Sequence, residues 1–269
     1  MSEERMTEAR GPRASALVTG ASTGIGRAFA QRLGRDQHDL VLVARDTERL
    51  EALAKDLAEM HGAHAEVFPA DLTDPADLAR VEERLRSDPP DLLVNNAGFG
   101  TVGRFAELDL ETEEREIRLN VLALMRLTRV VLPAMLERGR GAVINISSLA
   151  GESAGPFMAT YAGTKAFVTT FTESLAEEVR GSGVRVQAVL PGFTRTEFQA
   201  RAGVKDSAVP GFAWLTAEAV VDASLGGLEK GQVICVPGLG YRALAAAQKL
   251  APRGFMRRLY AESLRRTLD

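Results

Sequence analysis

The stretch that decides the fold is residues 14–26, which read ASALVTGASTGIG. Residues 14–19 form a short apolar run typical of a buried strand, and the glycines at 20, 24 and 26 follow it directly. Residues 25–33 then carry apolar side chains at the spacing of an amphipathic helix. A strand, a glycine-rich turn and a helix in this order let a pyrophosphate approach bare backbone at a helix N-terminus. A tight turn that binds nothing is the alternative interpretation of the glycines alone.

The same alternation continues through most of the 269 residues. The patterns predict strands at 14–19, 40–44, 65–70, 91–95, 142–147, 184–190 and 233–236, and helices at 25–33, 45–60, 75–86, 110–137, 160–179 and 217–228. Repeated strand–helix order requires parallel strands with right-handed crossovers. The sequence therefore predicts an α/β fold, a Rossmann-type doubly wound parallel sheet of about seven strands with helices on both faces. We expect a flexible leader at 1–13, one domain at 14–238 and an amphipathic helical extension at 239–269.

Composition limits the classes of function. The net charge is -3, 45% of the residues are hydrophobic, and no apolar run approaches the roughly 20 residues of a membrane span. We therefore expect a cytoplasmic protein that does not bind nucleic acid. Cys235 lies in an apolar run and predicts a buried thiol. The three histidines lack metal-ligand spacing, so no metal site is expected.

Tyr161 and Lys165 are four residues apart at the start of a predicted helix. This spacing places both side chains on one helix face, with Cβ atoms about 5–6 Å apart. A tyrosine pKa lies near 10, and it would have to fall by about three units for ready proton exchange near pH 7; a neighbouring ammonium acts in that direction. A partly buried tyrosine beside a solvated lysine is the alternative interpretation of the pair alone.

Two further segments supply the context for this pair. Residues 144–148 read INISS, a strand that ends in hydroxyls, and residues 95–98 read NNAG. With the Gly-x-x-x-Gly-x-Gly turn and Tyr-x-x-x-Lys, their order and spacing resemble the short-chain dehydrogenase/reductase family over about residues 14–238. The resemblance implies an NAD(P)(H)-dependent oxidoreductase that reduces a ketone or aldehyde to an alcohol, or the reverse, with Tyr161 as general acid or base.

The resemblance also assigns catalytic residues. It implies that Ser148, rather than Ser147, joins Tyr161 and Lys165, and that Ser148 and Tyr161 donate hydrogen bonds to the carbonyl oxygen of the substrate. It further implies that Asn120 completes a tetrad by bending the long helix and holding a water that leads from Lys165 to solvent. Without the family, Asn120 is an ordinary residue of a polar helix face.

The cofactor is expected to be NADP(H) rather than NAD(H). Ala44 leaves the place of an acidic ribose partner empty at the end of the second strand, and Arg45 can meet a 2′-phosphate. A shift of the strand register would make Asp46 the ribose partner and reverse the preference. The full set of cofactor-binding residues implied by the resemblance is Gly20, Ser22, Thr23, Gly24, Ile25, Gly26, Arg45, Asp71, Leu72, Asn96, Ala97, Gly98, Tyr161, Lys165, Pro191, Gly192, Thr194 and Thr196. Asp71 would hold the adenine amino group, and Thr194 and Thr196 would meet the nicotinamide carboxamide and a phosphate.

The substrate is expected to be an apolar carbonyl compound such as a ketosteroid, a keto-acyl chain or an aliphatic ketone. The loops expected around the nicotinamide carry aromatic and large apolar side chains, which are Phe99, Phe157, Met158, Phe193, Phe198, Phe212 and Trp214. Plain core or loop packing is the alternative for each of them.

Two other functions were weighed. A catalytically silent dinucleotide-sensing regulator would be expected to lack some of Ser148, Tyr161 or Lys165, all of which are present. A sugar-nucleotide epimerase or dehydratase resembles longer chains with a separate substrate domain. The family's two long helices often form subunit interfaces, so we expect a homodimer or homotetramer.

The segment 241–269 is basic, with seven arginines and lysines against two acidic residues. Its apolar spacing predicts two short amphipathic helices separated at Pro252, which cover the substrate pocket or contact a lipid surface. Packing on the acidic body or on a neighbouring subunit is the favoured alternative.

Overall fold

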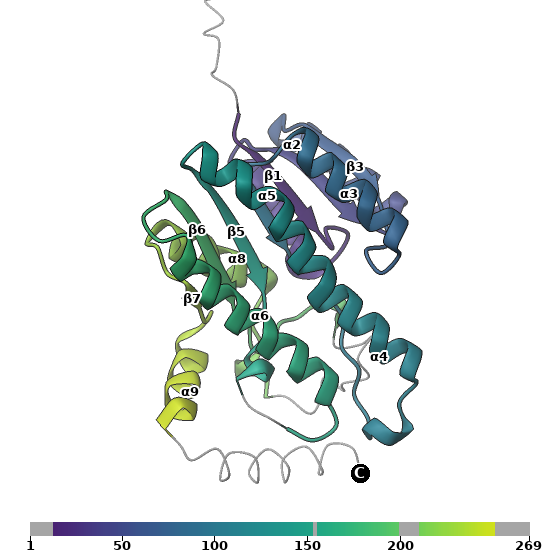
Figure 1. Cartoon of the computed structure of the whole chain (residues 1–269), viewed down its shortest axis with the longest axis vertical. Coiled ribbons are helices and arrows are strands. Elements are labelled where there is room, and N and C mark those ends of the chain that lie inside the picture. Colours follow the sequence, from purple (N-terminus) through teal and green to yellow (C-terminus); the bar gives the residue numbers. More distant parts are fainter. Residues whose placement is uncertain (1–12, 153–154, 199–209, 251–269) are drawn as a thin grey trace, which may run out of the picture.

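The computed structural model describes residues 13–152, 155–198 and 210–250. Within these residues the chain builds a seven-stranded parallel sheet in the order β3-β2-β1-β4-β5-β6-β7 (Figure 1). The strands are β1 (Ser15–Thr19), β2 (Asp39–Ala44), β3 (Ala65–Pro69), β4 (Leu92–Asn95), β5 (Gly141–Ile146), β6 (Val184–Val189) and β7 (Ile234–Cys235). Strand order reverses between β1 and β4, and in such sheets ligands bind at the carboxyl ends of the strands near this reversal.

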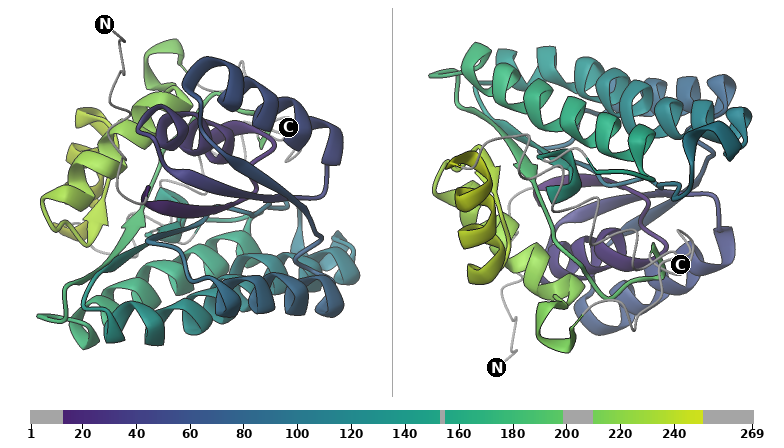
Figure 2. Two further views of the ribbon diagram at one scale, coloured as in Figure 1. Left: turned by 90° about the horizontal axis from the view of Figure 1, so that it is seen from above. Right: turned by 90° about the horizontal axis from the view of Figure 1, so that it is seen from below.

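Helices cover both faces of the sheet (Figure 2). One face is covered by α1 (Gly24–Arg35), α2 (Thr47–His61) and α8 (Ala217–Glu229), and the other by α3 (Pro75–Ser87), α5 (Leu124–Glu137) and α6 (Ala159–Glu178). Short 3-10 turns lie in the connections, namely η1 (Phe105–Glu107), η3 (Leu149–Gly151) and η5 (Gly211–Ala213). The predicted doubly wound α/β fold is confirmed.

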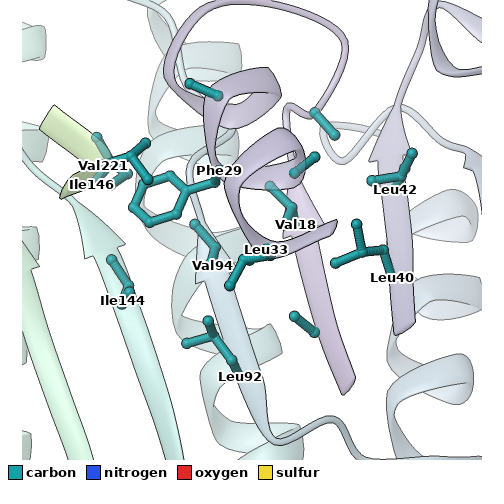
Figure 3. Packing of buried hydrophobic residues seen from close by; sticks show 14 of the residues in the cluster. Val18, Phe29, Leu33, Leu40, Leu42, Leu92, Val94, Ile144, Ile146 and Val221 are labelled. Carbon is teal, nitrogen blue, oxygen red and sulfur yellow. The ribbon is translucent and has the colours of Figure 1, made fainter. Parts of the chain in front are cut away.

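Each strand contributes alternate side chains to two separate cores. In β1, Ala16 and Val18 face the α1 side, whereas Leu17 faces the α5 side. This two-sided burial explains why the strands read as uninterrupted apolar runs. On the α1 side the fully buried ring of Phe29 lies against the sheet beside Val94 (Figure 3).

The long helix expected at 110–137 is divided by a π-helical segment. α4 (Leu110–Ile117) continues into η2 (Arg118–Ala123), which has π-helical hydrogen bonding, and then into α5. The extra residue per turn accommodates Asn120, and such π segments are frequent at functional sites. By length and mean hydropathy, 1.6, the stretch Leu110–Glu137 could cross a membrane. In this fold it forms part of the layer that covers the α5 side of the sheet, together with α3 and α6, and its Leu127 and Val131 are fully buried.

The C-terminal part of the described chain is helix α9 (Leu239–Leu250), at the β7 edge of the sheet (Figure 1). Its residues Tyr241 and Ala245 pack against Leu149 and Leu190. The second expected helix, Pro252 and the leader at 1–12 lie outside the described residues. Cys235 is buried as predicted, and burial raises the pKa of its thiol to about 11.

The packing of Phe29 predicts the stability of the α1 layer. Phe29→Ala should lower the free energy of unfolding by about 3–5 kcal/mol, because it removes a buried ring and leaves a cavity. Phe212 is 93% exposed and is the matched control. Phe212→Ala should change the free energy of unfolding by less than about 0.5 kcal/mol. Equal denaturant midpoints for the two variants would contradict this account of the core.

Candidate active site

The glycine-rich turn connects the end of β1 to the start of α1. Gly20 and Gly24 have φ values of +66° and +55°, which favour glycine. A Cβ atom on Gly26 would lie 2.3 Å from the carbonyl oxygen of Gly20, so only glycine allows α1 to come this close. The first turn of α1 contains no acidic residue, and its free amides and dipole favour an anion there. Ser22, Thr23 and Ile25, partly buried, complete the turn.

A hydrogen-bonded clamp joins this turn to the loop after β4. The Thr19 hydroxyl accepts hydrogen bonds from the backbone N–H groups of Asn96 (2.9 Å) and Ala97 (3.0 Å). The Asn96 side chain donates to the carbonyl oxygens of Thr19 (2.9 Å) and Gly20 (3.2 Å). Thr19 was not predicted to have a role; the feature of the sequence that could have indicated one is a hydroxyl directly before the first glycine.

Tyr161, Lys165 and Ser148 lie together at the carboxyl end of β5. Tyr161 and Lys165 occupy the first two turns of α6, and the Lys165 ammonium lies 5.8 Å from the centre of the Tyr161 ring. Lys165 is 5% exposed, and its Nζ donates to the carbonyl oxygen of Ile146 at 2.8 Å. Ser148 hydrogen-bonds to Tyr161.

Ser147, although adjacent, faces away from this group. It is buried, and its hydroxyl donates to the carbonyl oxygen of Lys165 at 2.8 Å and lies 2.8 Å from the Thr169 hydroxyl. The structure therefore gives Ser147 a role in holding α6 against β5 and leaves Ser148 as the serine beside Tyr161.

The expected decrease in the pKa of Tyr161 is wrong for this arrangement. Burial raises the pKa of Tyr161 to about 12; the Ser148 hydrogen bond lowers it and the Glu116 carboxylate raises it further. Burial also lowers the pKa of Lys165 to about 8, against the Glu116 carboxylate, which raises it. Burial of the phenol is the largest of these effects on the pKa of Tyr161. At pH 7 the site therefore holds a neutral phenol, which is a proton donor, beside a cationic Lys165.

Asn120 lies in the π-helical segment and is 1% exposed, so a place on a polar helix face is excluded. Its Oδ1 accepts from the Phe99 N–H at 3.2 Å, and its Nδ2 donates to the Phe99 carbonyl at 2.8 Å and to the Thr164 hydroxyl at 3.1 Å. Asn120 thus fastens the loop after β4 to α6 next to Lys165. Its role in holding a water stays a prediction.

The carboxyl end of β2 places Arg45 and Asp46 differently. Arg45 is 66% exposed, and its guanidinium lies 3.8 Å from the carboxylate of Asp71. Asp46 is the N-cap of α2, where its carboxylate accepts from the Arg49 N–H at 3.1 Å and pairs with the Arg49 guanidinium at 3.3 Å. The carboxylate of Asp46 is therefore engaged in the helix cap, which disfavours the alternative in which Asp46 serves the ribose.

The two residues expected at the adenine end, Asp71 and Leu72, differ in which of their atoms can contact a ligand. Asp71 accepts hydrogen bonds from the backbone and hydroxyl of Thr73, at 2.9 and 2.7 Å, and also lies near Arg45. Leu72 is 5% exposed, and its side chain packs in the core on the α5 side. Only the backbone of Leu72 is therefore placed to meet a ligand.

The loop after β6 packs over the glycine-rich turn. A Cβ atom on Gly24 would lie 3.1 Å from the side chain of Thr196. Thr194 is 3% exposed, and its hydroxyl donates to the carbonyl oxygen of Gly192 at 3.0 Å. Pro191, which precedes Gly192, is also buried. The fold thus brings this loop, as expected, to the cofactor side of the sheet.

Tyr241 of α9 holds this loop in place, a role that the sequence analysis missed. Its hydroxyl accepts from the Phe193 N–H at 3.1 Å and donates to the carbonyl oxygen of Ala213 at 2.7 Å. The ring lies so close to Gly192 that a Cβ atom there would be 2.2 Å away. The first turn of the C-terminal helix therefore fixes two loops of the site.

One aromatic ring lies beside Tyr161, and two others pair with each other in the chain that follows β6. The ring of Phe198 lies 5.5 Å from the Tyr161 ring, and Phe193 lies 5.8 Å from Trp214. Phe193 is 43% exposed and Phe212 is 93% exposed. Phe99, Phe157 and Met158 are partly buried, and Phe157 has φ +69°. Exposed apolar surface of this kind favours an apolar substrate.

Together these segments fit a dinucleotide. The glycine turn leaves bare backbone and a helix N-terminus for a pyrophosphate, and the exposed guanidinium of Arg45 lies at the end of β2 for a 2′-phosphate. Gly98 supports this fit at the other end, because a Cβ atom there would lie 2.9 Å from Asn120 Oδ1 and 3.5 Å from Lys165 Nζ. Among the residues that the structure describes, no group of acidic, histidine or cysteine side chains could hold a metal ion.

Comparison with known proteins gives consistent matches. Residues 14–206 match the model of the short chain dehydrogenase family. A very-long-chain 3-oxoacyl-CoA reductase from Anas platyrhynchos is 34% identical over 82% of this chain and 72% of its own length. The matches to this reductase and to the curated relatives that follow it span between 50% and 72% of the lengths of those proteins.

Two solved structures share most of the fold. A short-chain dehydrogenase from Sphingobium yanoikuyae in complex with NADPH is 43% identical, with TM-score 0.82, over 90% of this chain and 95% of that one. A bulky-bulky ketone specific alcohol dehydrogenase from Comamonas testosteroni is 36% identical, with TM-score 0.78, over 90% of this chain and 93% of that one.

The two neighbouring serines should respond differently to the same substitution. Ser148→Ala should lower turnover by ~100-fold or more, because it removes a donor that faces the reacting oxygen. It should lower the free energy of unfolding by only about 0.5–1 kcal/mol, because the hydroxyl also accepts a capping hydrogen bond from the Ala150 N–H. Ser147→Ala should lower the free energy of unfolding by about 0.5–1.5 kcal/mol, because it removes the hydrogen bonds of a buried hydroxyl while its partners, the Lys165 carbonyl and the Thr169 hydroxyl, stay bonded to each other. Steady-state rates and denaturant unfolding measure both. A larger loss of rate in Ser147→Ala would contradict the assignment.

Proposed function

Since this chain belongs to the short-chain dehydrogenase family, we propose that it reduces a bulky, apolar ketone to the corresponding alcohol with NADPH. The family makes it an oxidoreductase acting on a carbonyl or alcohol group. The observation that carries the direction is the neutral Tyr161 hydroxyl, hydrogen-bonded to Ser148 and adjoining the cationic Lys165. A protonated phenol at neutral pH is the form that a reduction consumes.

The residues act on the carbonyl oxygen of the substrate. Ser148 and Tyr161 donate hydrogen bonds to it, and these bonds strengthen as negative charge grows on that oxygen. NADPH, when bound, supplies the hydride. Tyr161 then gives its proton to the oxygen, and the ammonium of Lys165 stabilises the phenolate that forms. Asn120 holds α6 and the loop after β4 in fixed positions relative to each other during this proton transfer.

NADP(H) is the cofactor in this proposal. Its support is the exposed guanidinium of Arg45, which meets no acidic competitor from Asp46 because that carboxylate caps α2. The Sphingobium yanoikuyae structure, which contains NADPH, is 43% identical.

The substrate class follows from the apolar surroundings of Tyr161. Phe198 contacts Tyr161, and the exposed ring of Phe193 extends the apolar surface on the loop after β6. Relatives named for 3-oxoacyl-CoA and for bulky ketones support the same class. An open apolar surface is expected to favour substrates with large groups beside the carbonyl.

A carbonyl screen with NADPH oxidation as readout tests this function. The panel should pair each bulky ketone with a small analogue of the same carbonyl type, for example a diaryl ketone with acetone and a long 3-oxoacyl thioester with a short one. We expect higher kcat/KM for the bulky member of each pair. Equal values, or turnover of small polar ketoses alone, would overturn the substrate class.

Assembly and location complete the proposal. Leu122 of η2 and Phe167 of α6 are 43% and 38% exposed on the outer side of the α5 and α6 layer. We expect this surface to pair with a second copy in a homodimer or homotetramer in the cytoplasm. Light scattering on the purified protein and cell fractionation measure these two properties, and a monomer or a membrane fraction would contradict them.

Tyr161→Phe tests the proton donor. The substitution keeps the ring and removes one hydroxyl, so turnover should fall by at least ~100-fold. NADPH binding, followed by fluorescence, should persist, which separates lost chemistry from a lost cofactor. A variant with a near-normal rate would overturn the mechanism.

Arg45→Ala tests the cofactor preference. The ratio of kcat/KM for NADPH to that for NADH should fall by roughly 10- to 150-fold, because one charge-assisted contact to the 2′-phosphate is lost. Asp46→Asn is the matched control, since asparagine also caps helices, and it should leave the ratio near that of the unaltered protein. An unchanged ratio in Arg45→Ala would exclude Arg45 as the 2′-phosphate partner.

A further inference from the structure

Two buried carboxyl groups lie behind the active site on α4 and were assigned no role from the sequence. Glu116 is fully buried and Glu113 is 3% exposed. A buried carboxyl group is costly unless it is paired, hydrogen-bonded or protonated, so two of them one helical turn apart require an explanation.

Hydrogen bonds connect both groups to the loop that touches the catalytic residues. Glu116 Oε2 accepts from the Thr101 N–H at 3.0 Å and from the Thr101 hydroxyl at 3.1 Å, and Glu113 Oε1 accepts from the same hydroxyl at 2.6 Å. The second oxygen of Glu113 accepts from the hydroxyl of Thr160, which precedes Tyr161. The second oxygen of Glu116 has no hydrogen-bond partner among the described residues.

This loop lies between Glu116 and the reacting groups. A Cβ atom on Gly100, the neighbour of Thr101, would lie 2.5 Å from the Tyr161 ring, and one on Gly98 would lie 3.5 Å from Lys165 Nζ. α4 also packs directly against α6. Glu116 is therefore joined through this loop to the surroundings of Tyr161 and Lys165, and its second oxygen is a buried acceptor without a hydrogen-bond partner among the described residues.

We propose that Glu116 is a positioning residue whose buried carboxylate keeps Lys165 protonated during catalysis. Lys165 is nearly as buried as Glu116, so its ammonium needs a compensating negative charge that water does not supply. The N–H and hydroxyl of Thr101 hold Glu116 in place. The inference rests on the proposed carbonyl reduction, in which Lys165 acts as a cation.

The pKa values of Glu116, Lys165 and Tyr161 depend on one another. Burial raises the pKa of Glu116 to about 7; Thr101 and Lys165 lower it and Glu113 raises it. Glu116 in turn raises the pKa values of Lys165 and Tyr161. A carboxyl group with a pKa of about 7 is mostly ionised at about pH 8, so the charge of Glu116 is present around the midpoint of the Lys165 titration.

Glu116→Gln tests this proposal, because the amide oxygen can keep the Thr101 hydrogen bonds while the charge is removed. The Lys165 side chain is titrated by carbon NMR at its Cε, with the signal assigned by its loss in Lys165→Met. We expect the Lys165 titration in Glu116→Gln to move to lower pH by about half a unit or more. The alkaline limb of kcat for ketone reduction should move in the same direction.

Two further variants make the result specific. Glu114→Gln makes the same change at an exposed glutamate of α4 that pairs with Arg118, and should move neither curve. Thr101→Val keeps the backbone N–H and removes the hydroxyl that favours ionised Glu116. It should move the Lys165 titration to lower pH by a smaller amount, and it decides the question if Glu116→Gln does not fold.

The outcomes separate this inference from the proposed function. A Lys165 titration that is the same in Glu116→Gln and Glu114→Gln would overturn the role of Glu116, even if the rate fell uniformly at all pH values. The NMR titration needs no substrate. A shifted Lys165 titration in a protein that reduces no ketone would instead preserve the coupling and overturn the proposed function.

Discussion

The clamp between Thr19 and Asn96 is the interaction on which the rest of the site depends. It joins the carboxyl ends of β1 and β4, the two strands between which strand order reverses. Because neighbouring strands diverge at such a reversal, a gap opens there in which a dinucleotide can lie. The clamp determines how the glycine turn, on one side of the gap, faces the loop that carries Gly98 and Phe99.

The loop after β4 is the second part of this framework. Asn120 holds it at Phe99 and Glu116 holds it at Thr101, both from the helix that runs through α4 and the π-helical segment. In a regular α-helix, residues four apart lie on one face. The π-helical turn changes this phase and permits Asn120 to reach Phe99 and Thr164 at once. A local irregularity of one helix thereby coordinates two catalytic elements.

Burial governs the chemistry of the site more than simple proximity of charges does. Lys165 lies beside the Tyr161 ring, yet removal of the phenol from water raises the pKa of Tyr161. The Tyr161 hydroxyl is therefore protonated at neutral pH, and it requires stabilisation only when it loses its proton. A preorganised cation that acts at that moment lowers the energy of the transition state more than that of the ground state.

The sequence by itself determined the sheet, its helices and the residues beside the reacting oxygen, because strand periodicity, glycine spacing and Tyr-x-x-x-Lys are local patterns. It could not determine the protonation of Tyr161 or Lys165, since their pKa values depend on burial by segments distant in the chain. It also left Asp46 open as a ribose ligand until the strand register made it a helix cap. The roles of Thr19, Glu116 and Tyr241 were decided by tertiary structure alone, because their partners are brought near only when the sheet and its covering helices assemble.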